Sequence, residues 1–139
     1  MTIAKFFITA VICLNAIMAY PVGDIDCTPD RRIKTYTYDV DEVYTMVLNY
    51  GFQSYIEFGR GETIQTIYVG DQYAWKITPM DNRLFIRPLV QYGFTNMTVI
   101  TDRYSYEFDL VAKKLEPGQD KDVVYKMKFY YPRRSKAVQ

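Results

Sequence analysis

Apolar residues recur at every second position through most of the chain. In segment 104–110, for example, Tyr, Tyr, Phe and Leu alternate with Ser, Glu and Asp. Successive side chains of a β-strand point to opposite faces, so this period predicts a strand that is buried on one face only. No stretch has a convincing helical period. The pattern therefore restricts the chain to an all-β fold.

Nine segments have this pattern, at intervals near ten residues. They are 33–38, 43–48, 52–58, 64–68, 73–77, 84–87, 97–100, 104–110 and 123–131. This spacing predicts a single β-sandwich of about nine short, mostly antiparallel strands, which we place at residues 20–132. Between strands, Gly70-Asp71 is typical of a two-residue hairpin and Pro79–Asn82 of a turn. Residues 133–139 predict a polar tail or the start of a linker.

The first nineteen residues have the composition of an export signal. Lys5 is the only charged residue among them, an apolar run follows from Phe6 to Ile17, and the small residue Ala19 precedes Tyr20-Pro21. This is the three-part pattern of a secretory signal peptide, and the run is shorter than the roughly 20 residues that span a membrane. We therefore expect residues 1–19 to be removed on export.

Removing that segment would leave Cys27 as the only cysteine. An intramolecular disulfide is then impossible, and a lone cysteine in an exported protein predicts either a free thiol or an intermolecular disulfide. Cys27 lies in a polar, turn-prone stretch, where we expect it to be exposed.

Composition excludes several kinds of chemistry. The chain has no histidine, which rules out Ser-His-Asp and Cys-His nucleophiles and histidine-ligated zinc. Neither a Gly-rich phosphate loop nor the spacing of a calcium loop is present, so we expect no cofactor and no metal. A net charge of +1 argues against a nucleic-acid partner.

That near-zero charge conceals a gradient along the chain. Residues 20–71 carry nine acids and four bases, whereas residues 113–136 carry eight bases and three acids. Segments of −5 and +5 would favour head-to-tail packing of identical copies, although an ordinary solvated surface has the same composition.

Several short motifs, in a fixed order, resemble one known family. They are DRRI at 30–33, YD at 38–39, IEF at 56–58, GD at 70–71 with Trp75, Asn82 with LFIRP at 84–88, and TNMTVITDR at 95–103 followed by Tyr104, Tyr106 and Phe108. The closing residues Tyr125, Phe129, Tyr131 and Pro132 match as well. Over residues 30–132 the chain resembles the N-terminal domain of the TrbG/CagX family of type IV secretion and conjugal transfer subunits.

The resemblance implies a structural role and no enzymatic activity. Family members assemble with a short lipoprotein and a TonB-like partner into a periplasmic ring between the two membranes, and their N-terminal β-sandwich lies in the inner-membrane-facing layer. Full-length members continue into a second β domain, whereas this chain ends at residue 139. We therefore expect a periplasmic subunit that contacts the TonB-like partner and full-length family members as a homo- or hetero-oligomer. Lipoprotein contact is in doubt without the second domain.

Five residues are candidates for the interface: Trp75, Arg87, Asn96, Tyr130 and Tyr131. Large aromatic residues dominate the energy of interfaces, but the alternation favours an inward-facing core position for Trp75, beside Tyr73 and Ile77. Asn96 could instead cap a turn, and Arg87 could pair with Glu57 or Glu107. The tyrosines at 104, 106, 125 and 131 predict a core-facing stripe. The remaining tyrosines predict an exposed surface that packs against other subunits.

Two other functions remain open from sequence. A truncated paralogue could modulate or block ring assembly, and an exported β-sandwich with exposed tyrosines could bind carbohydrate or peptidoglycan. A glycosidase would need a carboxylate pair such as Glu57 and Glu62 to converge. The first lies on a strand face and the second beside a turn, so we expect no catalytic pair.

Overall fold

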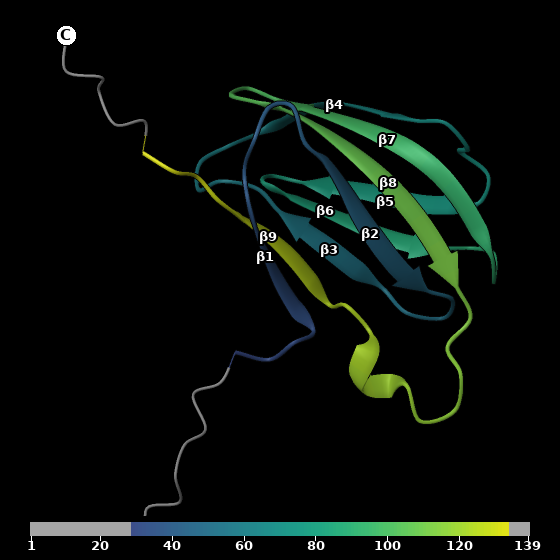
Figure 1. Cartoon of the computed structure of the whole chain (residues 1–139). Helices are drawn as coiled ribbons and strands as arrows, with labels where there is room; N and C mark the ends of the chain where they lie inside the picture. Colours follow the sequence, from purple (N-terminus) through teal and green to yellow (C-terminus); the bar gives the residue numbers. More distant parts are fainter. Residues whose placement is uncertain (1–28, 134–139) are drawn as a thin grey trace, which may run out of the picture.

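Nine strands form two β-sheets that pack face to face in the computed structural model, which describes residues 29–133 (Figure 1). In spatial order, the five-stranded sheet contains β1 (Ile33–Thr37), β9 (Lys126–Tyr130), β3 (Ser54–Glu57), β6 (Arg83–Pro88) and β5 (Trp75–Met80). The four-stranded sheet contains β2 (Val43–Asn49), β8 (Ser105–Lys113), β7 (Gly93–Thr101) and β4 (Ile64–Val69). The predicted all-β sandwich of about nine strands is confirmed. The expected signal peptide and Cys27 lie outside the described residues.

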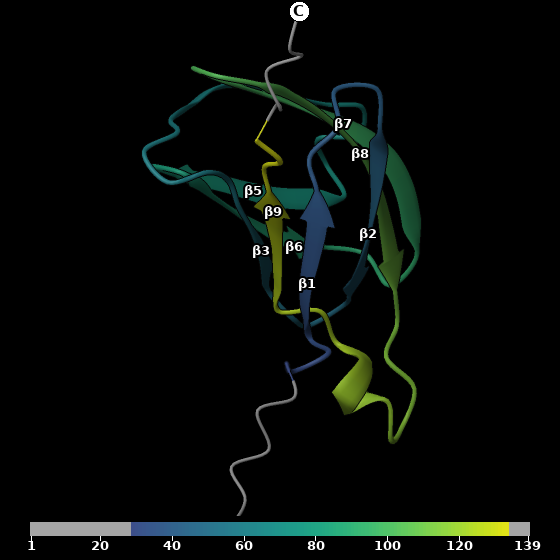
Figure 2. The same cartoon turned by 60° about the vertical axis from the view of Figure 1, so that its left-hand side comes forward.

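The two sheets are mixed. Of the seven strand pairings in the described residues, four are antiparallel and three are parallel: β1 with β9, β3 with β9, and β2 with β8. Consecutive strands β1 and β2 enter different sheets, and each then pairs with a strand from the last third of the chain (Figure 2). Both ends of the domain are thereby fixed by pairings between residues far apart in sequence.

The inward-facing residues of both sheets form one core. Its buried members include Met46 and Leu48 of β2, Ile56 of β3, Leu84 and Ile86 of β6, Met97 and Val99 of β7, Phe108 and Leu110 of β8, and Met127 of β9. Most of them occupy the positions that the period-two pattern assigns to the core. Each side chain of this size contributes roughly 1.5–3 kcal/mol to folding when it is fully buried.

Two predicted turns have a different structure. Pro79 lies within β5 and is paired with Leu84, and the chain reverses at Asp81-Asn82 instead. Proline is tolerated there because β5 is an edge strand and needs no second hydrogen-bonded neighbour. Gly70-Asp71 begins a connection from β4 to β5, which belong to different sheets, so it forms no hairpin.

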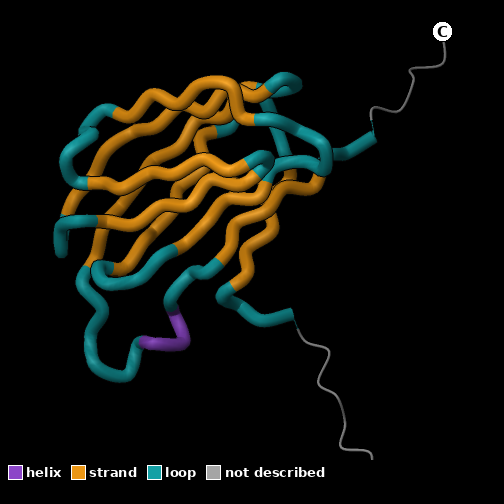
Figure 3. The backbone as a smooth tube through the Cα atoms, turned by 180° about the vertical axis from the view of Figure 1, so that it is seen from behind, coloured by secondary structure: helices purple, strands orange, loops and turns teal. Residues whose placement is uncertain are grey.

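Three aromatic residues predicted to face the core are exposed. Tyr73 is 85% exposed in the loop before β5, Tyr104 is 38% exposed before β8, and Tyr125 is 42% exposed before β9. Each lies just outside its strand, where alternation no longer determines the direction of a side chain. The connection from β8 to β9 contains the short 3-10 turn η1 (Asp120–Asp122) and extends away from both sheets (Figure 3).

Candidate functional site

A buried carboxylate is the centre of the most extensive polar cluster in the described residues. Glu62, in the turn between β3 and β4, is 2% exposed. Its Oε1 accepts hydrogen bonds from the hydroxyls of Thr101 and, at 2.8 Å, Tyr106. Its Oε2 accepts from the Gly59 amide at 2.8 Å and from the Tyr131 hydroxyl at 3.2 Å. The Tyr106 and Tyr131 oxygens are themselves 2.6 Å apart, and because each phenol has a single proton, the two tyrosines donate in two of these three contacts at a time.

Within residues 29–133 the Glu62 carboxylate forms no ion pair, and these hydrogen-bond donors are its polar contacts. Hydrogen bonds to an ionised acceptor are about twice as strong as neutral ones, which offsets the cost of burial. Burial raises the pKa of Tyr106 and of Tyr131 well above the usual range, and for Tyr106 the hydrogen bonds to Tyr131 and Glu62 raise it further. Both phenols therefore remain protonated as donors. The Glu62 carboxylate is itself enclosed, and the cluster joins the β3–β4 turn to β7, β8 and the segment after β9.

An aromatic groove adjoins this cluster on its exposed side. The cavity measures about 570 Å³ and is lined by Tyr38, Asp39, Val40, Tyr104, Tyr131 and Pro132. The Tyr104 and Tyr131 rings stack with centroids 5.3 Å apart, and the Tyr38 ring lies 4.5 Å from that of Tyr104. Beside it, Arg103 donates to the carbonyls of Arg60 and Gly61. The groove is open and has an aromatic lining, which suits contact with another protein surface.

The outer face of the five-stranded sheet carries a concentration of positive charge. We call it the basic face. It consists of the acid Glu57, the aromatic pair Tyr55 and Phe85, and five bases: Lys76, Arg83, Arg87, Lys126 and Lys128. The Tyr55 and Phe85 rings of that pair lie 5.3 Å apart. On β3 and β6, the strand residues that alternate with these point inward and are buried. The net charge of this set is 5 − 1 = +4.

Glu57 pairs with two neighbours on this face. Its Oε2 lies 3.4 Å from Arg83 Nε and 3.5 Å from Lys126 Nζ. The expected partner Arg87 is not among its ion pairs in residues 29–133, because the register places Arg83 opposite Glu57. Glu107, the other expected partner of Arg87, lies on the opposite sheet and accepts from the Thr98 hydroxyl at 2.7 Å.

The five interface candidates are dispersed over the molecule. Trp75 is buried in the core, 4% exposed, and its indole N–H has no hydrogen-bond partner among the described residues. Arg87 is exposed on the basic face, and Asn96 is exposed on the outer face of the other sheet, within β7 and not at a turn. Tyr130 is 60% exposed, while the half-buried Tyr131 belongs to the Glu62 cluster and the groove.

The role of Glu62 as a buried hydrogen-bond acceptor was not predicted from the sequence. A signal was present in retrospect: Glu62 lies three residues after Gly59, a spacing that lets a side chain accept from the first amide of a turn. Thr101, Tyr106 and Tyr131 could not be assigned to it, because they are 39, 44 and 69 residues away. Glu57 and Glu62 do not share a site, as expected.

Metal-binding clusters and membrane-spanning helices also bear on the class of protein. Within residues 29–133, no three or more Cys, Asp or Glu side chains lie close enough to bind a metal ion together. The same residues include no helix with the length and hydrophobicity of a membrane span. The fold and site together define an all-β sandwich with a structural polar cluster and open, charged surfaces.

Comparison with known proteins identifies the family. The family model for CagX, a conjugal transfer protein, matches residues 31–139, and the chain belongs to this family. It is 24% identical over 131 residues to the type IV secretion system protein virB9 of Bartonella quintana, covering 91% of this chain and 45% of that protein. It is 29% identical over 121 residues to the type IV secretion system protein PtlF of Bordetella pertussis, covering 74% and 44%. The chain spans less than half the length of these relatives.

Proposed function

We propose that the chain is a non-enzymatic structural subunit of a type IV secretion system, which acts in the periplasm through protein–protein contacts. The observation that carries this proposal is the extent of the similarity. The family match covers the whole sandwich, residues 31–139, and the similar proteins are named as type IV secretion proteins. Because the chain spans less than half the length of those proteins, the proposal concerns the sandwich and its contacts.

The distribution of polar groups supports a role in contact. The buried carboxylate of Glu62 is enclosed by hydrogen-bond donors of the chain itself and serves the fold. The accessible features are an open aromatic groove and a charged sheet face, which are broad surfaces. Tyrosine and arginine are enriched in protein interfaces, and both occur on these surfaces. We place these contacts in the inner-layer ring, with the TonB-like partner and full-length family members on the other side.

Co-purification tests the proposal. A tagged full chain is co-expressed with the type IV secretion subunits of its own host, purified through the tag and measured by mass photometry. We expect it in an assembly much larger than the 16.4 kDa chain. Cell fractionation should recover it from the periplasmic fraction. An unrelated exported β-sandwich with the same tag is the control. A chain that stays monomeric in every mixture, or that stays in the cytoplasm, would contradict the proposal.

A further inference from the structure

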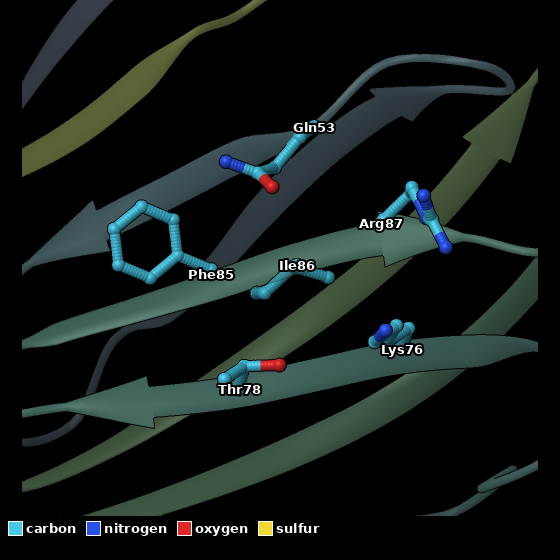
Figure 4. Close-up of a pocket in the computed structure, with 6 residues that line it drawn as sticks. All are labelled: Gln53, Lys76, Thr78, Phe85, Ile86 and Arg87. Atoms are coloured by element: carbon cyan, nitrogen blue, oxygen red, sulfur yellow. The ribbon is translucent and has the colours of Figure 1, made fainter.

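The basic face contains two like charges in direct opposition. Lys76 of β5 and Arg87 of β6 are register partners, and both are exposed (Figure 4). Like charges directly opposite each other on neighbouring strands destabilise a sheet. Gln53, Thr78, Phe85 and Ile86 complete a small polar cavity of about 80 Å³ between them. An arrangement of two cations, an amide and a hydroxyl around a cavity is suited to an anionic group such as a carboxylate.

The segment that leads from β1 into the first residue of β2 has the complementary composition. We call residues 39–43 the acidic loop; they are Asp39, Val40, Asp41, Glu42 and Val43, and all five are exposed. Val40 is 65% exposed and Val43 is 51% exposed, which is unusual for residues of this type. In residues 29–133, none of the three acids forms an ion pair within the chain. Among the described residues, the acidic loop thus offers three carboxylates without an ion-pair partner, beside two exposed apolar side chains.

The acidic loop is held in one conformation by its own strand. The buried Tyr44 hydroxyl accepts from the Asp39 amide at 2.7 Å and lies 3.1 Å from the Thr37 carbonyl, to which it donates. The Asp39 carboxylate accepts from the Asp41 amide at 3.0 Å. A loop that is already ordered loses little conformational entropy when it binds.

We propose that the acidic loop of one copy docks on the basic face of a second copy. Carboxylates of the loop enter between Lys76 and Arg87, while Val40 contacts the Tyr55 and Phe85 rings. This inference rests on the proposed scaffold function and specifies one of its contacts. The observations favour a second copy as the binding partner, because one chain carries both surfaces. Among the described residues, no acid of the loop forms an ion pair with a base of the basic face. The contact is heterologous, so it repeats from copy to copy and generates a ring or an open chain.

A nucleic acid fits the basic face less well. Glu57 lies in the middle of the face and would repel a phosphate backbone that crossed it. The Tyr55 and Phe85 rings pack against each other and are half-buried, which leaves little of either ring for base stacking.

Two matched variants of the full chain test the docking. Asp41→Asn/Glu42→Gln removes charge from the loop, and Lys76→Gln/Arg87→Gln removes charge from the face. Sedimentation velocity over a concentration series should show self-association of the unmodified chain that weakens between about 0.05 M and about 0.5 M salt. Each variant should weaken it by on the order of tenfold, since each loses exposed ion pairs. The control Lys114→Gln/Glu116→Gln, in the exposed β8–β9 connection, should leave it unchanged.

Mixing the two variants gives a sharper result. Each retains one of the two complementary surfaces, so an equimolar mixture should form dimers that cannot extend further. Reversing both surfaces in one chain, with Asp41→Lys/Glu42→Lys and Lys76→Glu/Arg87→Glu, should restore extended association. Circular dichroism establishes that every variant is folded.

Three outcomes would overturn the inference: a monomeric unmodified chain at all concentrations, association that the variants leave unchanged, or a monomer whose basic face binds a fluorescent oligothymidine. These outcomes are distinct from failure of the proposed function. A chain that enters the host secretion assembly regardless of the variants retains its function and loses this contact. A chain that self-associates as expected but never enters that assembly retains the contact and loses the function.

Discussion

At the scale of single residues, Glu62 is a buried carboxylate that holds several parts of the fold together. Its two oxygens lie within hydrogen-bond distance of four donor groups. Glu62→Gln would turn an amide NH2 toward some of these donors and leave buried groups unpaired, at a cost of about 2–4 kcal/mol. Urea denaturation followed by tryptophan fluorescence measures this. Glu57→Gln, on the surface, should cost about 1 kcal/mol or less. Equal losses for the two variants would contradict a special role for Glu62.

Tyr106 and Tyr131 make stability dependent on alkaline pH. Burial holds the pKa of both above the ordinary 10.0 of tyrosine, whereas in the unfolded chain both phenols ionise near that value. The unfolded state then releases protons that the folded state retains, so the contribution of these two tyrosines to stability is constant well below about pH 10 and falls above it. The slope is up to about 1.4 kcal/mol per pH unit for each tyrosine.

The test is a series of urea titrations from about pH 8 to about pH 11. Tyr106→Phe should lower stability at neutral pH, because it removes a donor to Glu62, and should also make the alkaline slope shallower. Phe108→Leu, a core substitution next to it on β8 that removes no ionisable group, should lower stability equally at every pH. A slope that Tyr106→Phe leaves intact would show that other groups control the alkaline transition.

The sequence could not have predicted that these residues form one cluster. Alternation correctly placed Tyr106 and Phe108 on the inner face of β8, because that inference needs only local sequence. It says nothing about which residue of another strand lies opposite. Glu62 meets Thr101, Tyr106 and Tyr131 only through the packing of two sheets, which no local pattern encodes.

At the scale of elements, the β5–β6 turn depends on one unusual backbone conformation. Asp81 has φ of 53°, in the left-handed region. Aspartate tolerates this conformation better than most residues, and a β-branched residue tolerates it poorly. Asp81→Val should therefore destabilise the fold by about 1–2 kcal/mol. Asp81→Gly should be neutral or slightly stabilising, as measured by thermal unfolding. Equal effects of the two changes would mean that the aspartate side chain, and not its backbone, is what matters.

The same elements show where local patterns succeed and fail. Strands β2, β3, β6 and β8 follow the predicted alternation, because each has one face on the core. Pro79 was assigned to a turn on local preference, yet at an edge strand its missing N–H costs nothing. Gly70-Asp71 has hairpin composition but connects two sheets, so its neighbours in space are Thr95 and Asn96 of β7. Sheet membership, which the sequence does not specify, decides both cases.

At the scale of the whole molecule, charge is separated by surface and not only along the sequence. The sequence gradient has an acidic first half and a basic end. Folding places Lys126 and Lys128 of the basic end beside Lys76, Arg83 and Arg87 from the middle of the chain, on one sheet face. The three acids of residues 39–43 remain in a loop outside that face. The fold thus turns a linear gradient into two discrete surfaces, which is the arrangement that directional assembly requires.

The whole sandwich also depends on its last strand. β9 lies between β1 and β3 and pairs with both in parallel, and its Met127 is 1% exposed in the core. Without β9 the five-stranded sheet is divided, and β1 loses the strand that anchors it. A chain ending at residue 122 should therefore show no cooperative thermal transition, while its secondary structure content falls.

Complementation distinguishes a missing strand from a merely shortened chain. A synthetic peptide of residues 123–133 supplies β9 together with the buried Val123 and the half-buried Tyr131. Added to the chain ending at residue 122, it should restore the cooperative transition, because strand insertion recovers two ladders and the core contacts of Met127. A peptide with the same residues in reverse order should fail, since β9 runs parallel to both of its neighbours. Cooperative unfolding of the shortened chain alone would show that the remaining strands close the sandwich without β9.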